Sequence, residues 1–325
     1  MPTAVQTRIS ARHSLEEAIG NTPLIQLRHV TQSVPAGVQV FAKAEHLNPG
    51  GSVKDRPAIA MILEAERKGR LRSGKTILDA SSGNTGIAYG MIAAERGYDL
   101  TLCLPSNASA ERKQILRAYG VKIIETSSSE GTDGAQILAR QLAERFPDKY
   151  VYLDQYNNEA NWRAHYETTG NEIWEQTKGT VTHFITGLGT TGTFTGVTRR
   201  LRECNASIRA ADVQPDLPLH GIEGLKHLPT AHVPGIYDAS LADEQLTVDT
   251  ESSLLMTQRL AKEEGLFVGP SSGANVFAAV ELAQRLSPGS VVVTILCDGG
   301  EKYLSANQQL RARLTVPTDH VFVSR

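Results

Sequence analysis

Cysteine is scarce in this sequence, with three residues in 325. Cys103, Cys204 and Cys297 lie far apart, with no C-x-x-C pair and no histidine at ligand spacing. This excludes a disulfide framework and a zinc finger, and we expect no metal site. A chain of this length buries enough apolar surface to fold without such links. The few cysteines suit a reducing compartment, so we predict a cytoplasmic protein.

Excess charge and long apolar runs are also missing. The 33 basic residues nearly balance the 35 acidic ones, which leaves a formal net charge of −2. Nucleic acids and anionic membranes attract clustered basic residues, so neither is expected as a partner. The longest apolar stretches, such as residues 291–297, are far shorter than the roughly 18 residues of a membrane span. A small molecule is therefore the expected ligand.

Short β-branched runs alternate with helical patterns from residue 38 onward, which predicts an α/β fold with parallel sheets. Strands are predicted at residues 38–44, 76–80, 100–104, 122–126, 183–186, 208–213, 266–268 and 290–297. Helices are predicted at residues 58–68, 85–96, 110–119, 134–145, 193–203, 253–264 and 273–286. Two segments break the alternation. Residues 214–237 contain four prolines and predict a long ordered loop, and residues 155–162 suggest a domain crossover.

Four glycine-rich junctions stand between a strand and a helix, where backbone N–H groups and the helix dipole favour anions. The first spans residues 48–57. Ser52 and Asp55 match a capping box, or Asp55 is itself the N-cap. Either register places Lys54 at a helix N-terminus, where the dipole disfavours a cation and favours a nucleophilic amine. The alternative is a solvated lysine near a turn.

The second junction, residues 81–86, offers hydroxyl, amide and N–H donors for a carboxylate, although a simple N-cap with a flexible turn explains it equally well. The third, residues 187–193, contains G-x-G-x-x-G followed by Asp212, so a nicotinamide oxidoreductase is a rival. Its three threonines favour a phosphomonoester instead. The fourth, residues 269–273, matches G-x-S-x-G, with Asp298 and His320 in hydrolase order. We expect that match to be accidental, because only one clear strand follows Ser271.

Together the junctions supply an activated lysine, a carboxylate site, a phosphate site and a neutral hydroxyl, which pyridoxal phosphate bound to an amino acid would use. The motifs NTPL (21–24), NPGGSVKDR (48–56), SSGNTGIA (81–88), GLGTTGT (187–193) and GPSSGA (269–274) resemble those of fold-type-II pyridoxal-phosphate enzymes, specifically the B-type cysteine synthases. The resemblance runs from about residue 15 to residue 305. It implies a tryptophan synthase β-like fold with two three-layer αβα domains.

The same resemblance implies the domain limits, the partners and the site. The smaller, moving domain would span residues 48–158, and residues 1–47 and 159–325 would form the larger, cofactor-binding domain. A homodimer is expected, while a serine acetyltransferase partner has no support in the sequence. Lys54 would carry pyridoxal 5′-phosphate and act as the base at Cα. The cofactor would also contact Asn84, Gly189, Thr190, Thr191, Gly192, Thr193 and, at the pyridine nitrogen, Ser271. The substrate carboxylate would contact Ser81, Ser82, Asn84, Thr85 and Gln155.

The implied reaction is a β-replacement that makes L-cysteine from O-acetyl-L-serine and sulfide, with thiosulfate as a second sulfur donor. Residues 224–229 depart from the B-type pattern, in which some members have paired arginines. Lys226 and His227 either favour an anionic substrate such as O-phosphoserine or thiosulfate, or form a solvated pair. Cys297 is more simply a core thiol than an active-site group. A cystathionine β-synthase-like enzyme, a serine or threonine dehydratase and a non-catalytic paralogue remain alternatives.

Overall fold

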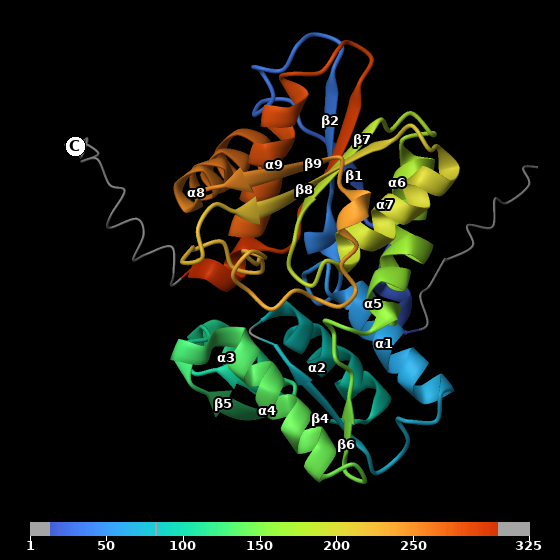
Figure 1. Ribbon diagram of the computed structural model, residues 1–325, viewed down its shortest axis with the longest axis vertical. Helices are drawn as coiled ribbons and strands as arrows, with labels where there is room; N and C mark the ends of the chain where they lie inside the picture. Colours follow the sequence, from blue (N-terminus) through green and yellow to red (C-terminus); the bar gives the residue numbers. More distant parts are fainter. Residues whose placement is uncertain (1–13, 82, 305–325) are drawn as a thin grey trace, which may run out of the picture.

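The computed structural model describes residues 14–81 and 83–304. The chain forms two lobes, each built on one sheet with helices on both faces (Figure 1). Within the described residues, no helix has the length and apolarity that a membrane crossing requires. The predicted α/β class with mostly parallel sheets is confirmed.

The larger lobe contains a six-stranded sheet in the order β1-β2-β10-β7-β8-β9. Its strands are β1 (Leu24–Gln26), β2 (Gln39–Lys43), β7 (His183–Gly187), β8 (Arg209–Pro215), β9 (Glu244–Val248) and β10 (Val291–Ile295). Only β1 pairs antiparallel with its neighbour. One face packs against α9 (Pro270–Ala283), which α8 (Thr250–Arg259) covers, and the other against α7 (Gly192–Cys204) and α6 (Gly170–Gln176).

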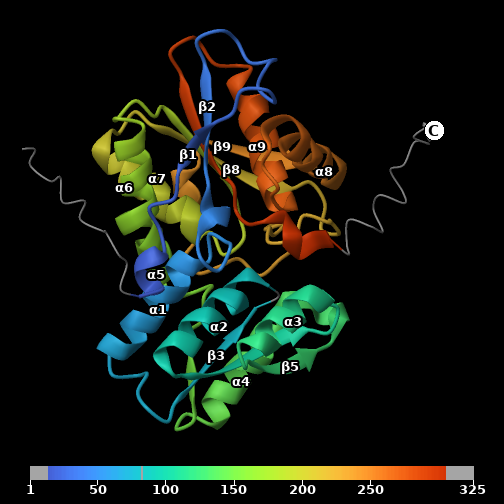
Figure 2. The ribbon, with the colours of Figure 1, turned by 180° about the vertical axis from the view of Figure 1, so that it is seen from behind.

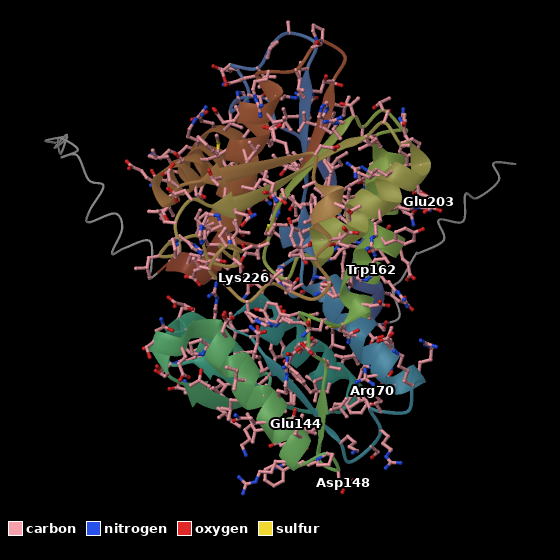
Figure 3. The ribbon with its side chains drawn as sticks, viewed as in Figure 1. Arg70, Glu144, Asp148, Trp162, Glu203 and Lys226 are labelled. Atoms are coloured by element: carbon pink, nitrogen blue, oxygen red, sulfur yellow. The ribbon has the colours of Figure 1, made fainter. Side chains whose placement is uncertain are left out.

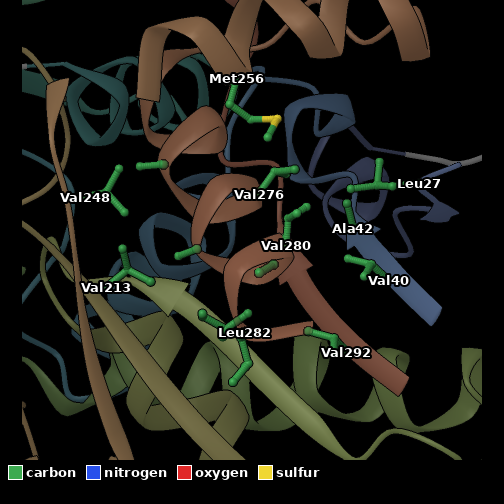
Figure 4. Close-up of a cluster of buried hydrophobic side chains, with 14 of the residues drawn as sticks. Leu27, Val40, Ala42, Val213, Val248, Met256, Val276, Val280, Leu282 and Val292 are labelled. Atoms are coloured by element: carbon green, nitrogen blue, oxygen red, sulfur yellow. The ribbon is translucent and has the colours of Figure 1, made fainter. Parts of the chain in front are cut away.

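Helix α9 is central to the larger hydrophobic core. Its Val276 and Val280 face a cluster that includes Val40 and Val292 from the sheet and Met256 from α8 (Figure 4). Because α9 lies between the sheet and α8, nearly all its side chains are buried. The helix begins at Pro270, three residues before the predicted start, since proline is well tolerated in the first helical turn.

The smaller lobe contains an all-parallel sheet in the order β5-β4-β3-β6. Its strands are β3 (Thr76–Ala80), β4 (Asp99–Pro105), β5 (Lys122–Thr126) and β6 (Tyr150–Tyr152). Helix α4 (Gly131–Arg145) covers one face (Figure 1). Helices α1 (Asp55–Arg67), α2 (Asn84–Arg96) and α3 (Ala110–Ala118) lie on the other (Figure 2). Every residue of β3 is buried, as expected for a parallel strand covered on both faces.

Seven of the eight predicted strands are present, and the predicted strand at 266–268 is wrong. Only Val268 of that segment forms a bridge, to Gly299, because the chain turns directly into α9. The short strands β1, β6 and β9 are additional to the prediction, as are α5 (Glu159–Ala164), the π-helix His165–Thr169 and α6. The long loop predicted at 214–237 is present, but it begins at residue 216, because β8 extends to Pro215, and it continues to residue 243 with one short 3-10 helix. The domain limits at 48–158 stay a prediction.

Candidate active site

The four junctions converge on one cavity between the lobes. The turns after β3 and β7 and the start of α9 all line it, because the carboxyl ends of both parallel sheets point toward each other. The cavity measures about 960 Å³, including space open to solvent. Its described lining contains three cationic side chains, Lys54, Arg112 and Lys226, and no Asp or Glu. The site is therefore suited to anionic ligands.

Lys54 occupies the N-cap position of α1, at the wall of the cavity. Burial lowers the pKa of its amine from the ordinary value, while Cys297 and Asp298 nearby act in the opposite direction. Both predicted registers, the capping box and Asp55 as the N-cap, are wrong, because Lys54 is the N-cap and Asp55 is the first residue of the helix. The Asp55 carboxylate accepts from the Gly50 N–H at 2.5 Å, and Ser52 Oγ accepts from the Lys54 N–H at 3.2 Å. The lowered pKa thus arises chiefly from burial, whereas the sequence predicted it from the helix dipole.

A buried ion-pair network anchors the helix that follows Lys54. The Arg56 guanidinium makes paired hydrogen bonds to Glu45, both at 2.7 Å, and to Glu172, at 2.6 and 2.7 Å. Lys43 also binds Glu172, at 2.6 Å. These cations outweigh the effect of burial and lower the pKa of Glu45 to about 2. The start of α1 is therefore tied to the short 3-10 helix Glu45–Leu47, which follows β2, and to α6.

The turn after β3 is organised by Ser81 and Thr85. Ser81 Oγ accepts hydrogen bonds from the N–H groups of Gly83 and Gly86, at 3.2 and 3.0 Å. Thr85 donates to Gln155 Oε1 at 2.8 Å, and both side chains line the cavity. Ser82, also predicted to bind the substrate, lies outside the described residues. The other predicted carboxylate-binding residues are therefore brought together.

Asn84 connects the two lobes at the floor of the cavity. Its Nδ2 donates to Asp298 Oδ2 at 2.7 Å, and the same oxygen accepts from the Tyr303 hydroxyl at 2.6 Å. Asn84 Oδ1 is buried and has no hydrogen-bond partner among the residues that the structure describes. The side chain thus keeps an unsatisfied polar atom, as expected if a ligand completes its contacts.

The turn after β7 contains residues 189–193, which are predicted to bind the cofactor phosphate. A Cβ on Gly189 would lie 2.3 Å from the Gly224 carbonyl oxygen, so only glycine fits there. Thr191 adopts a left-handed backbone with φ of 70°, which is strained for a β-branched residue. Its Oγ1 is buried, and no group in the described part of the chain bonds to it. An open N-terminus of α7 beside an unsatisfied hydroxyl suits the phosphate of the predicted cofactor.

Ser271 is the second residue of α9 and lines the cavity with 4% of its surface exposed. It contacts Cys297, whose thiol pKa burial raises to about 11. The hydrolase arrangement has no support among the described residues: Asp298 is bonded to Asn84 and Tyr303, and His320 lies outside them. Ser271 is therefore available as the neutral hydroxyl that the cofactor's ring nitrogen would meet.

The remaining predicted residues divide between the cavity and its surroundings. Lys226 lines the cavity at the boundary of the lobes (Figure 3), with its ammonium 3.0 Å from Asp133 and 4.9 Å from the ring centre of Tyr156. His227 bonds instead to Thr230, at 2.8 Å, and is not part of the lining. Asp212, which a dinucleotide would require, is buried against the Tyr237 hydroxyl. The lysine and histidine are thus not a pair at the site.

Arg112 is a cavity residue that the sequence analysis missed. It extends from α3, pairs with Glu223 of the long loop and stacks with its guanidinium carbon 5.0 Å from the ring centre of Tyr303. Its side chain is 5% exposed. No motif marks this arginine, because it lies in the first turn of α3 and reaches the cavity only through the packing of α3 beside Gly83.

Residues 15–298 match the family described as pyridoxal-phosphate dependent enzymes. The chain belongs to this family. It is 48% identical over 299 residues to a cysteine synthase of Aquifex aeolicus, covering 91% of each chain. It is 45% identical to cysteine synthase B of Escherichia coli, covering 90% of this chain and 94% of that one. A crystal structure of cysteine synthase from Entamoeba histolytica superposes with a TM-score of 0.88 at 33% identity, over 94% and 93% of the chains.

Membership in the pyridoxal-phosphate family confirms the predicted cofactor and the predicted resemblance. The residues present also fit the group. The unsatisfied Thr191 and Asn84 oxygens, the glycines of the β7–α7 turn and a lysine amine line the same cavity. The nicotinamide alternative is overturned, because the chain that contains the glycine motif belongs to the pyridoxal-phosphate family. Asp212, which a dinucleotide would require, accepts a hydrogen bond from Tyr237 instead and is not part of the cavity lining.

Proposed function

We propose that this enzyme makes L-cysteine from O-acetyl-L-serine and sulfide by β-replacement. The observation that carries the proposal is the single cavity holding the Lys54 amine, the turn at residues 189–193 and the turn at residues 81–85. Its similarity to cysteine synthases over most of the chain supports the same reaction class.

Lys54 is proposed to hold the cofactor and then to move the proton at Cα of the substrate. The bound cofactor supplies an electron sink for the pair left at Cα. The amine of Lys54 is suited to accept that proton because its pKa lies below the ordinary lysine value. The same group can return the proton once sulfur has added at Cβ.

The substrate carboxylate is proposed to bind at the N-terminus of α2. Ser81, Thr85 and Gln155 surround that turn with hydroxyl and amide groups, and the helix start adds backbone N–H donors. The carboxylate is then fixed while the lysine acts on Cα. Ser271 offers the ring nitrogen a hydroxyl instead of a carboxylate, which gives a weaker electron sink and favours loss of a β-substituent over transamination.

Contacts between the lobes are proposed to exclude water during the reaction. Arg112 pairs with Glu223 and Lys226 pairs with Asp133, so two ion pairs join the long loop to the smaller lobe beside the cavity. Closure of such a site protects reactive species from hydrolysis. The residues 48–158 are proposed to move as the smaller domain.

O-Acetylserine is proposed over O-phosphoserine as the substrate. Lys226 is paired with Asp133, and His227 bonds to Thr230 outside the cavity lining. Among residues 14–81 and 83–304, this side of the cavity therefore offers no unpaired cation to a phosphate leaving group. Sulfide is proposed as the sulfur donor, with thiosulfate as the second candidate. By the family resemblance, we also propose a cytoplasmic homodimer.

Rapid-mixing absorbance measurements on the holoenzyme test these proposals. The spectral change should be faster with O-acetylserine than with O-phosphoserine, and it should reverse when sulfide is added, with cysteine detected as product. Thiosulfate in place of sulfide tests the second donor, and light scattering tests the dimer. A colourless protein that gives no spectral change with either substrate would contradict the proposed function.

A further inference from the structure

Two buried side chains lie directly behind the turn that is proposed to bind the cofactor phosphate. Asn161 on α5 and His165 at the start of the π-helix are both 1% exposed. They stand four residues apart, and together we call them the backing pair. Neither belongs to the cavity lining.

The approach of the backing pair depends on two glycines of α7. A Cβ on Gly192 would lie 2.0 Å from Asn161 Oδ1, and a Cβ on Gly196 would lie 2.1 Å from the Trp162 carbonyl oxygen. The glycines are also four residues apart, so they share the face of α7 that meets the backing pair. Any larger side chain would separate the two segments.

Asn161 donates a hydrogen bond to a hydroxyl of the turn. Its Nδ2 lies 2.7 Å from the Gln155 carbonyl oxygen and 3.2 Å from Thr190 Oγ1. The carbonyl can only accept, so it fixes which amide atom faces this way. Thr190 Oγ1 therefore accepts a hydrogen bond from Asn161, on the side away from the cavity. Its own O–H can then donate to a group in the cavity.

His165 lies in the same way behind the hydroxyl of Thr193. Its Nε2 lies 3.3 Å from Thr193 Oγ1, and its Nδ1 lies 2.9 Å from Thr169 Oγ1. Burial lowers the pKa of the imidazole to about 3, so the ring is neutral near pH 7. A neutral ring donates from one nitrogen and accepts at the other. The tautomer therefore decides whether His165 donates to Thr193 or accepts from it.

We propose that Asn161 and His165 are positioning residues that direct the hydroxyl protons of Thr190 and Thr193 toward the cofactor phosphate. In this arrangement the Thr169 hydroxyl donates to Nδ1, and the Nε2–H of His165 donates to Thr193 Oγ1. Each turn hydroxyl then accepts from the backing pair and donates to a phosphate oxygen. Hydrogen bonds arranged in such chains strengthen one another. This inference rests on the proposed role of residues 189–193.

The test compares pyridoxal phosphate with pyridoxal, which lacks the phosphate, in spectral titrations of the protein freed of cofactor. His165→Asn keeps a polar group near Thr169 but cannot reach Thr193. We expect about a tenfold loss of affinity for pyridoxal phosphate and less than a twofold change for pyridoxal, because one phosphate hydrogen bond is impaired. His165→Gln, whose amide extends toward the Nε2 position, should restore most of the affinity.

His183→Asn is the matched control. His183 also contacts a threonine, with Nδ1 2.8 Å from Thr182 Oγ1, but it lies at the opposite end of β7 from the turn. Both affinities should stay unchanged in this variant. Equal losses for the two ligands in His165→Asn, or no loss for either, would overturn the proposal.

Imidazole ¹⁵N–¹H correlations of the unaltered holoenzyme supply a second measurement that needs no stable variant. The His165 ring should carry its proton on Nε2, and a proton on Nδ1 instead would contradict the arrangement. Failure of the proposed function is distinguishable, because the unaltered chain would then form no cysteine from O-acetylserine and sulfide and yet still prefer pyridoxal phosphate to pyridoxal. An unaltered chain without that preference would contradict the role of residues 189–193 on which the inference rests.

Discussion

Replacing Arg56 with methionine should destabilise the larger lobe strongly. The guanidinium is 1% exposed and makes four charged hydrogen bonds, two to Glu45 and two to Glu172. Methionine fills a similar volume but leaves Glu45, which is completely buried, without its main cation. Removing one partner of a buried ion pair costs roughly 3–5 kcal/mol of unfolding free energy.

The pH dependence of Arg56→Met follows from Glu45. In the unaltered chain the folded-state pKa of Glu45 is about 2, below the ordinary 4.5. Its stabilisation is therefore fully present above pH 4.5 and disappears only as the pH falls through about 2. In the variant, burial without the guanidinium raises this pKa above the ordinary value. The variant's deficit should then shrink as the pH is lowered from 7 toward 5, because protonation removes the buried charge.

Urea unfolding followed by tryptophan fluorescence measures the loss of unfolding free energy close to the ion pairs of Arg56. The chain has two tryptophans, Trp162 on α5 and Trp174 on α6, and Glu172 lies beside the second. Arg96→Met is the control, because Arg96 also bridges two carboxylates but is 27% exposed. That variant should lose less than about 1 kcal/mol. An equally small loss in Arg56→Met, or a deficit that grows on acidification, would refute the reasoning.

Three further predictions concern the cavity. Lys54→Ala should reduce cysteine formation by at least about a thousandfold, since the proposed proton carrier is lost, and a product assay checks this. Gly189→Ala should weaken cofactor binding at least about tenfold, because the new Cβ would lie 2.3 Å from the Gly224 carbonyl oxygen; spectral titration measures it. Glu223→Gln removes the ion pair with Arg112 and should raise the KM for O-acetylserine about two- to threefold. Added salt should raise the KM of the unaltered enzyme in the same way, because salt screens the ion pair.

The parts of the site that could be predicted from sequence are those written in contiguous motifs at strand-to-helix junctions. Lys54, the turn at residues 81–85 and the turn at residues 189–193 each combine a strand end, glycines and polar side chains within a few residues. Parallel α/β topology then requires such turns to meet at the carboxyl edges of the sheets. The convergence on one cavity follows from local sequence together with that rule.

What could not be predicted depends on contacts distant in sequence. Arg112 meets Glu223 across 111 positions, and Asn84 meets Asp298 across 214. Neither pair has a local pattern that identifies its partner. Strand β6 was missed because three residues give too short an alternation to detect. The segment of α5, the π-helix and α6 carries many polar residues whose burial arises from packing on α7 and α1, which are distant in sequence.

The seating of the start of α1 on the larger lobe affects what can move. Arg56 ties this end of α1 to the short 3-10 helix after β2 and to α6, while the apolar face of the same helix packs on α2 of the smaller lobe. Helix α1 is therefore shared by both lobes, and Lys54 stands at the joint between them. If residues 48–158 move as proposed, the movement must either carry the charged hydrogen bonds of Arg56 along or break them. Because breaking them would leave Glu45 buried without its main cation, we expect the movement to pivot about this end of α1, so that Lys54 shifts little while the turn at residues 81–85 approaches or withdraws.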